Sequence, residues 1–189
     1  MLSQLRPCLI LFAFLMFLTG IVYPFAMTGG AQLLFPSKAN GSLVIDNDVV
    51  RGSELIGQSF TQDKYFWPRI SAAGQGYDAA ASSGANLGPT SKKLLDRIAA
   101  DAERVKAATG ASTLPPDAAT ASGSGLDPDI SPDYAALQVA RVAKARNLPE
   151  DKVKALVEAQ VKRPALGIFG EPRVNVLALN RALDALPLG

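Results

Sequence analysis

The sequence of 189 residues contains no histidine and only one cysteine, Cys8. Without histidine the chain cannot form a Ser-His-Asp triad or a Cys-His pair, and most zinc sites lose their usual nitrogen ligand. Because Cys8 borders an apolar run near the N-terminus, the rest of the chain offers no disulfide, thiolate nucleophile or cysteine metal site. Catalysis would therefore depend on carboxylates, lysine, tyrosine or serine alone, and we expect no catalytic residue and no metal ion.

An excess of charge of either sign is also missing. The 19 basic and 17 acidic residues leave a net charge of +2. Proteins that bind nucleic acid usually concentrate positive charge on one face or along one helix. The composition therefore argues against a nucleic-acid partner.

Charged side chains are absent from Pro7 to Ser37, and residues 8–27 are almost entirely apolar. A helix rises about 1.5 Å per residue and the hydrocarbon core is about 30 Å thick, so roughly 20 such residues span a bilayer. We therefore predict a transmembrane helix over residues 7–27. A cleaved signal peptide, cut near residues 29–31, is the alternative, but the apolar run continues beyond the length of a typical signal-peptide core.

The residues beside this span predict its orientation. Arg6 and the free amino group lie on one side, whereas the first basic residue on the other side is Lys38, which Asp46 follows. Because positive residues are retained on the cytoplasmic side, we predict that residues 1–6 are cytoplasmic and residues 28–189 lie outside. In a bacterium the outside is the periplasm.

Residues 28–189 have the size and composition of one soluble domain with its own core. The β-branched residues on both sides of Asp46–Asp48 predict a hairpin over residues 43–50. Apolar periodicity with start and stop signals predicts four helices. They run from about residue 90 to Gly110, over 132–146, from Pro149 to before Pro164, and from Val176 through Leu186. The fold class is thus α+β, with a single N-terminal transmembrane helix followed by one mixed domain.

Three further features of the domain bear on its function, and the first two have alternative interpretations. Residues 111–124, rich in Ala, Ser, Thr and Pro, predict a flexible segment that either divides the domain or crosses its surface. The aromatic cluster Tyr65–Trp67 is typical of a core edge, and an exposed binding platform is the alternative. Gln138 and Arg141 are neighbours by helical spacing, away from the apolar face of their helix.

Five segments stand in order along the chain: Tyr23-Pro24 in the apolar run, Gly52–Gln58 with Phe60 and Tyr65–Trp67, Ser83–Thr90, Ala121–Pro128 with Ile130–Pro132, and Leu166-Gly167 with Gly170–Leu177 and Leu179-Asn180. Together they resemble the KdpC family, which supplies a small subunit to the bacterial high-affinity potassium-transporting (Kdp) ATPase. Each segment alone is weak evidence for the family, but all five in the same order along the chain are specific to it. One departure is Asp129, because the family usually carries histidine there.

The resemblance implies a single-span, non-catalytic subunit in the bacterial inner membrane that assembles with a channel-like potassium-binding subunit and a P-type ATPase subunit. The chain lacks the Asp-Lys-Thr-Gly-Thr phosphorylation sequence, so it is not itself the ATPase. The leading hypothesis is a role in assembly and stabilisation of an ATP-driven potassium-uptake complex. Candidate contacts with partners are a small residue in the span and residues of two loops: Gly20, Gly84, Asn86, Gly88, Thr90, Asp127 and Pro128.

The resemblance also implies an alternative, a catalytic chaperone that raises the affinity of the pump subunit for ATP. Nucleotide contact would then fall on Gln138 and Arg141, with ATP as a possible rather than a firmly bound cofactor. No phosphate-binding loop of the Gly-x-x-x-x-Gly-Lys-Ser/Thr type is present. ATP is cytoplasmic, whereas the flanking charges place the domain outside. The competing interpretation is that Gln138 and Arg141 are an exposed pair on a solvated helix face.

Overall fold

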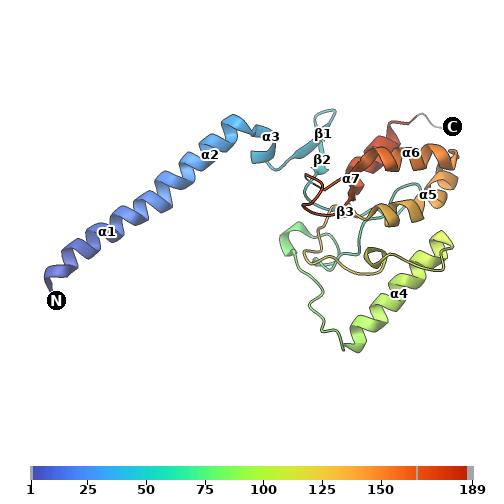
Figure 1. Ribbon diagram of the computed structural model, residues 1–189, viewed down its shortest axis with the longest axis horizontal. Coiled ribbons are helices and arrows are strands. Elements are labelled where there is room, and N and C mark those ends of the chain that lie inside the picture. The colour runs from blue at the N-terminus through green and yellow to red at the C-terminus, as the bar shows by residue number, and fades with distance from the viewer. Residues whose placement is uncertain (1, 165, 187–189) are drawn as a thin grey trace. The chain divides into compact units, whose positions relative to one another are not determined.

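The computed structural model describes residues 2–164 and 166–186 (Figure 1). The chain divides into two compact units, Met1–Arg51 and Gly52–Gly189. The fold class is confirmed: one apolar N-terminal helix long enough to cross a membrane is followed by short strands and helices.

The first unit begins with helical turns that join into one long helix. The 3-10 turn η1 (Leu2–Gln4) leads into α1 (Leu5–Phe17), the π-helical η2 (Leu18–Val22) and α2 (Tyr23–Leu34). The 30 residues of Leu5–Leu34 form the candidate membrane span, so the helix continues past residue 27. Pro24 cannot donate a hydrogen bond to the carbonyl four residues earlier and crowds it, which is a physical reason for a wider turn directly before it.

A short helix and a hairpin follow, and the second strand of the hairpin extends two residues beyond this unit. Helix α3 (Pro36–Ala39) precedes β1 (Leu43–Asp46) and β2 (Val49–Ser53), which pair as a two-stranded sheet. Asn47 and Asp48 occupy the turn with φ of 50° and 59°. Two consecutive residues with positive φ are the mark of a type I′ hairpin turn, so the predicted hairpin is confirmed.

The second unit contains the four predicted helices, α4 (Lys92–Thr109), α5 (Pro132–Arg146), α6 (Glu150–Gln160) and α7 (Val176–Asp184), together with the 3-10 turns η3 (Ala79–Ala81) and η4 (Pro116–Ala118). Local chemistry sets their ends. The Ser131 hydroxyl accepts the Tyr134 N–H at 3.0 Å and caps α5, and the Asn175 side chain accepts the Ala178 N–H at 3.0 Å and caps α7. Gly110 ends α4 in the left-handed conformation.

A small antiparallel sheet connects these helices. Its strands are β3 (Asp129–Ile130), β4 (Val161–Lys162) and β5 (Arg173–Asn175), in the order β3-β5-β4. Ile130 and Val161 both face Val174 across the ladders. Because β5 is central and Val174 is fully buried, the sheet contributes directly to the core.

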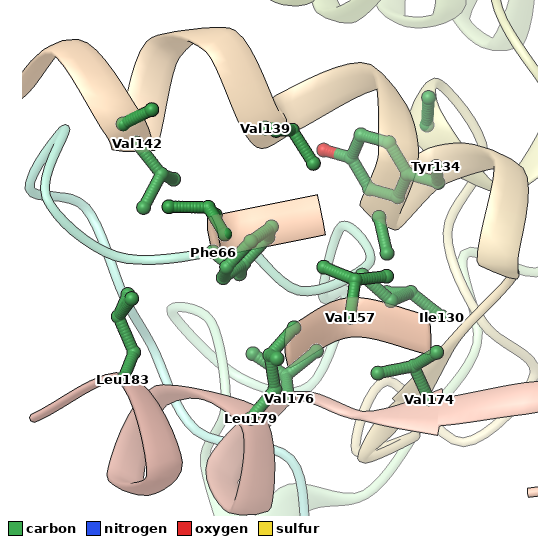
Figure 2. Packing of buried hydrophobic residues seen from close by; sticks show 14 of the residues in the cluster. Phe66, Ile130, Tyr134, Val139, Val142, Val157, Val174, Val176, Leu179 and Leu183 are labelled. Atoms are coloured by element: carbon green, nitrogen blue, oxygen red, sulfur yellow. The ribbon is translucent and has the colours of Figure 1, made fainter. Parts of the chain in front are cut away.

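The core lies between α5, α6, α7 and β5. Figure 2 shows Phe66 between the helix that carries Val139 and Val142 and the helix that carries Leu179 and Leu183. Phe66 is fully buried although it belongs to neither a helix nor a strand. Complete burial of such a side chain stabilises a fold by about 1.5–3 kcal/mol, so an irregular segment supplies part of the centre of this unit.

Residues 111–124 are mostly irregular, as predicted, but they do not divide the domain, since they lie inside one compact unit. Ala118, Ala119 and Ser122 are buried, and Ala121 forms a bridge with Ile70. Of the two interpretations, the segment therefore crosses the unit and packs on it. Its flexibility stays a prediction.

Candidate functional site

The segment of residues 63–67 runs between α5 and α7. Its backbone is hydrogen-bonded by side chains of these two helices instead of by a neighbouring strand. Each of its five carbonyl oxygens accepts a hydrogen bond from a side chain of α5 or α7. Arg141 donates to two of them, through Nη1 to Asp63 at 2.7 Å and through Nη2 to Tyr65 at 3.0 Å. Arg146 Nε donates to Lys64 at 2.7 Å. Asn180 Nδ2 donates to Phe66 at 3.0 Å, and Gln138 Nε2 donates to Trp67 at 3.1 Å. The carbonyls of this segment are thus satisfied by side chains alone.

Two buried amides hold consecutive residues of this segment in the same manner. Gln138 Oε1 accepts the Trp67 N–H at 2.7 Å while its Nε2 donates to the Trp67 carbonyl. Asn180 Oδ1 accepts the Phe66 N–H at 2.8 Å while its Nδ2 donates to the Phe66 carbonyl. Each amide therefore replaces the paired hydrogen bonds that a strand neighbour would give.

Arg141 contacts both Gln138 and the ring of Trp67. Its guanidinium carbon lies 3.9 Å from the centre of the Trp67 ring, a cation–π contact, and its Nη2 donates to Gln138 Oε1 at 2.7 Å. Burial lowers the pKa of Arg141 to about 10, so the group stays protonated at neutral pH. Gln138 and Arg141 are thus joined to one another and to one aromatic segment.

The prediction of an exposed pair is wrong, because Gln138 is 0% exposed and Arg141 is 9% exposed. The physical reason is that α5 is covered on two sides, by α6 and by residues 63–67. The prediction that the aromatic cluster is a core edge is confirmed, since Phe66 is fully buried and Trp67 is half-buried. Nucleotide contact by Gln138 and Arg141 stays a prediction.

The glycine-rich loops meet at a second place. Gly57 donates to the Leu126 carbonyl at 2.7 Å, and a Cβ on Gly57 would lie 2.6 Å from the Asp127 carbonyl oxygen. A Cβ on Gly84 would lie 2.8 Å from the Gly123 carbonyl oxygen. Glycine is therefore required where these loops approach one another, and they form one structural junction.

The predicted partner-contact residues lie in three places. Gly20 belongs to the N-terminal helix, where a Cβ would meet nothing within 4 Å. Gly84 lies in the loop junction, as does Asp127, which also forms an ion pair of 2.9 Å with Arg69. The Pro128 carbonyl, next to this junction, accepts the Val176 N–H at 2.9 Å. The remaining three are exposed in the loop before α4: Asn86, Gly88 and Thr90. Their contact with partners stays a prediction.

Sequence reasoning missed Asn180 and Arg146. Asn180 interrupts the apolar stripe of α7 with a polar residue, which is the available signal for an internal hydrogen-bonding role. Arg146 had no comparable signal, because its partners Lys64 and Asp184 lie far away in the sequence. Asp129, at the position of the expected histidine, pairs with Arg173 at 3.0 Å, and burial raises its pKa above the usual range.

Comparison with known proteins agrees with the resemblance. Residues 5–185 match the family described as K+-transporting ATPase, c chain. The chain is 56% identical over 186 residues to the potassium-transporting ATPase KdpC subunit of Caulobacter vibrioides, an alignment that covers 98% of this chain and 94% of that protein. For the KdpC subunit of Methylobacterium nodulans the identity is 54% over 198 residues, covering 98% of each chain. The chain therefore belongs to the KdpC family, the c chain of the K+-transporting ATPase.

Proposed function

We propose that this subunit assembles and stabilises the channel-like and P-type ATPase subunits of an ATP-driven potassium-uptake complex, without catalysing a reaction itself. The observation that carries the proposal is the helix Leu5–Leu34, because none of its most apolar 18-residue window is buried within this chain. One helix cannot enclose an ion path. An apolar helix whose most apolar part is not buried within its own chain is available to pack against lipid and against the helices of partner subunits.

The second part of the proposal concerns location. Arg6 at the start of the helix favours a cytoplasmic N-terminus under the positive-inside rule. The unit Gly52–Gly189 would then lie on the periplasmic face of the inner membrane, near the entrance to the channel-like subunit. Protease treatment of intact spheroplasts tests this: cleavage within the second unit is expected, and full protection would contradict the orientation.

The assembly role is tested by exchanging the anchor. The three subunits are co-expressed and purified through a tag on the ATPase subunit, with Leu5–Leu34 replaced by an unrelated apolar span of equal length. We expect this variant to be lost from the purified complex and potassium-stimulated ATP hydrolysis to fall with it, because the helix surface no longer fits its partner. A matched control keeps the native helix and exchanges only the exposed Lys38 for arginine. Complete assembly and activity with the foreign span would contradict the proposal.

Direct ATP binding, which would make the protein a catalytic chaperone, is the weaker proposal. To contact a nucleotide, Gln138 and Arg141 would have to give up five hydrogen bonds and the contact with Trp67. A periplasmic domain would also be separated from cytoplasmic ATP by the bilayer. Both considerations favour the assembly role.

A further inference from the structure

An apolar tip, defined as residues 166–169, projects from the connection between β4 and β5. Leu166, Ile168 and Phe169 are 88%, 75% and 63% exposed. Gly167 adopts φ of +77°, so the tip turns sharply. Strand β5 follows the tip closely, and Val174 of that strand is buried. Three large exposed apolar side chains within four residues are typical of an interaction surface.

Two hollows lie beside Glu171 and Pro172, which follow this tip in the chain. The first has a volume of about 420 Å³ and extends from Pro116 to Arg173, and the second has about 810 Å³ and includes Val161 and Pro164. Their linings share four residues: Ser131, Asp133, Glu171 and Pro172. The hollows therefore adjoin one another at the start of α5, and proline residues line much of their walls. Together they form the groove, and the apolar tip lies in the chain between Pro164 and Glu171, which both line it.

The charge of the groove is negative. The first hollow is lined by five carboxylates and two guanidinium groups, which leaves a net charge of −3. Both guanidinium groups are already paired, Arg69 with Asp127 at 2.9 Å and Arg173 with Asp129 at 3.0 Å. The Asp117 carboxylate accepts two hydrogen bonds from Ser131, at 2.7 and 2.9 Å.

The two remaining carboxylates lie where the hollows join. Within residues 2–164 and 166–186, Asp133 and Glu171 have no ion-pair partner. Among the residues that the structure describes, Arg163 is the one positive group that lines the second hollow. The shared part of the groove thus presents unpaired negative charge beside an apolar tip. A lysine or arginine flanked by apolar side chains complements both features.

We propose that this groove and the apolar tip bind a basic segment of another subunit of the potassium-transporting complex, with a lysine or arginine at Asp133 and Glu171 and apolar neighbours on Ile168 and Phe169. The inference rests on the proposed assembly role and gives it a contact surface. A bilayer surface is the less suitable occupant, since its phosphate groups would be repelled by the carboxylates. A second copy of this chain is the other alternative.

Photo-crosslinking identifies the occupant. A photoreactive amino acid is placed at position 168 in the complete complex in its membrane, and the adduct is identified by mass spectrometry. The expected result is a peptide from one of the other subunits, with a lysine or arginine within a few residues of the adduct. An adduct with lipid alone, with a second copy of this chain, or with a peptide lacking a basic residue would overturn the proposal.

Charge variants test the groove itself. Asp133→Lys combined with Glu171→Lys is expected to lower the crosslink yield roughly tenfold or more, because a like-charge contact replaces a charge pair. The control combines Glu103→Lys with Glu158→Lys, two exposed changes on α4 and α6 that leave the yield unchanged. Unfolding curves of both variants verify that the fold is retained.

The outcome separates the two proposals. Equal yields for the groove variant and its control would overturn the docking groove, whereas the assembly role would still be decided by the exchange of the anchor. A strong loss of yield in the groove variant alone, with the complex still held through its membrane helix, supports the groove. Loss of the crosslink in both variants would show that any added positive charge on this unit repels the partner, and it would overturn the docking groove.

Discussion

Replacing Gln138 by alanine tests the role of the side chain that connects α5 to residues 63–67. The change removes three hydrogen bonds, to the N–H and carbonyl of Trp67 and from Arg141. A buried hydrogen bond contributes about 1 kcal/mol net, and a buried polar group left unsatisfied costs about 1–3 kcal/mol. We therefore expect the free energy of unfolding to fall by about 3 kcal/mol, a large fraction of the roughly 5–15 kcal/mol that is typical of a domain.

The assay uses a probe that lies at the site. Trp67 is the only tryptophan in the chain, so its fluorescence during urea unfolding of the full chain in detergent reports on this contact. With a urea dependence of about 2 kcal/mol per molar, the midpoint should fall by about 1.5 M. Lys144→Ala, an exposed change on the same helix, is the control and should shift the free energy by less than about 0.5 kcal/mol.

Asn180→Ala is the matched variant that distinguishes a structural role of Gln138 from a role in nucleotide contact. Asn180 makes the corresponding pair of hydrogen bonds to Phe66 and has no part in the proposed ATP contact. We expect both amide variants to lower the urea midpoint, and any change in the ATP requirement of the assembled complex to occur in both. A Gln138→Ala variant of unchanged stability that alone raises the ATP requirement would refute the structural interpretation and support direct nucleotide contact.

Two further predictions concern close packing and alkaline pH. Gly57→Ala should lower the free energy of unfolding by about 1–3 kcal/mol, because the new Cβ would lie 2.6 Å from the Asp127 carbonyl oxygen. Gly88→Ala is the control and should change the free energy of unfolding little, because a Cβ there would meet nothing within 4 Å. Equal urea midpoints for the two variants would contradict this prediction. Burial raises the pKa of Tyr134 from 10.0 to about 12, so the neutral form is favoured in the folded state. The folded chain therefore loses stability as the pH rises from 10 towards 12, because the unfolded chain gives up this proton first. Tyr134→Phe should lose less stability than the wild type between these pH values in the same assay, and parallel curves would contradict the assignment.

The parts of the fold that the sequence predicts are the parts that local chemistry decides. Ser131 followed by Pro132, and Asn175 before an apolar stripe, define the starts of α5 and α7 within a few residues, and the structure confirms both. The hairpin is predicted for the same reason, since Asn47 and Asp48 tolerate positive φ. In each case the interacting groups lie within about four residues of one another.

The contacts that were missed connect distant residues. Gln138 and Trp67 are 71 positions apart, and Asn180 and Phe66 are 114 positions apart. Apolar periodicity identifies the face of a helix that packs on other apolar groups, but it assigns every polar residue to the solvent side. For this reason it predicts an exposed Gln138. A polar side chain that lies off the apolar stripe and bonds a distant backbone segment, as Gln138 does, has no signature in a single sequence, whereas Asn180 is signalled by its place within the stripe.

The segments that carry the family resemblance are, in large part, the segments that contact one another inside the molecule. Gly57 donates to Leu126, Ser83 donates to Ser124, and Asn175 donates through its side chain to the Glu54 carbonyl. These residues fix the fold, so a match at such positions is evidence for the family rather than for a ligand contact. The apolar tip at residues 166–169 differs, because part of it matches the family while its large side chains are exposed. A residue that resembles the family and yet is exposed is the better candidate for contact with another subunit, and this criterion favours Leu166 of the tip over the buried Gln138.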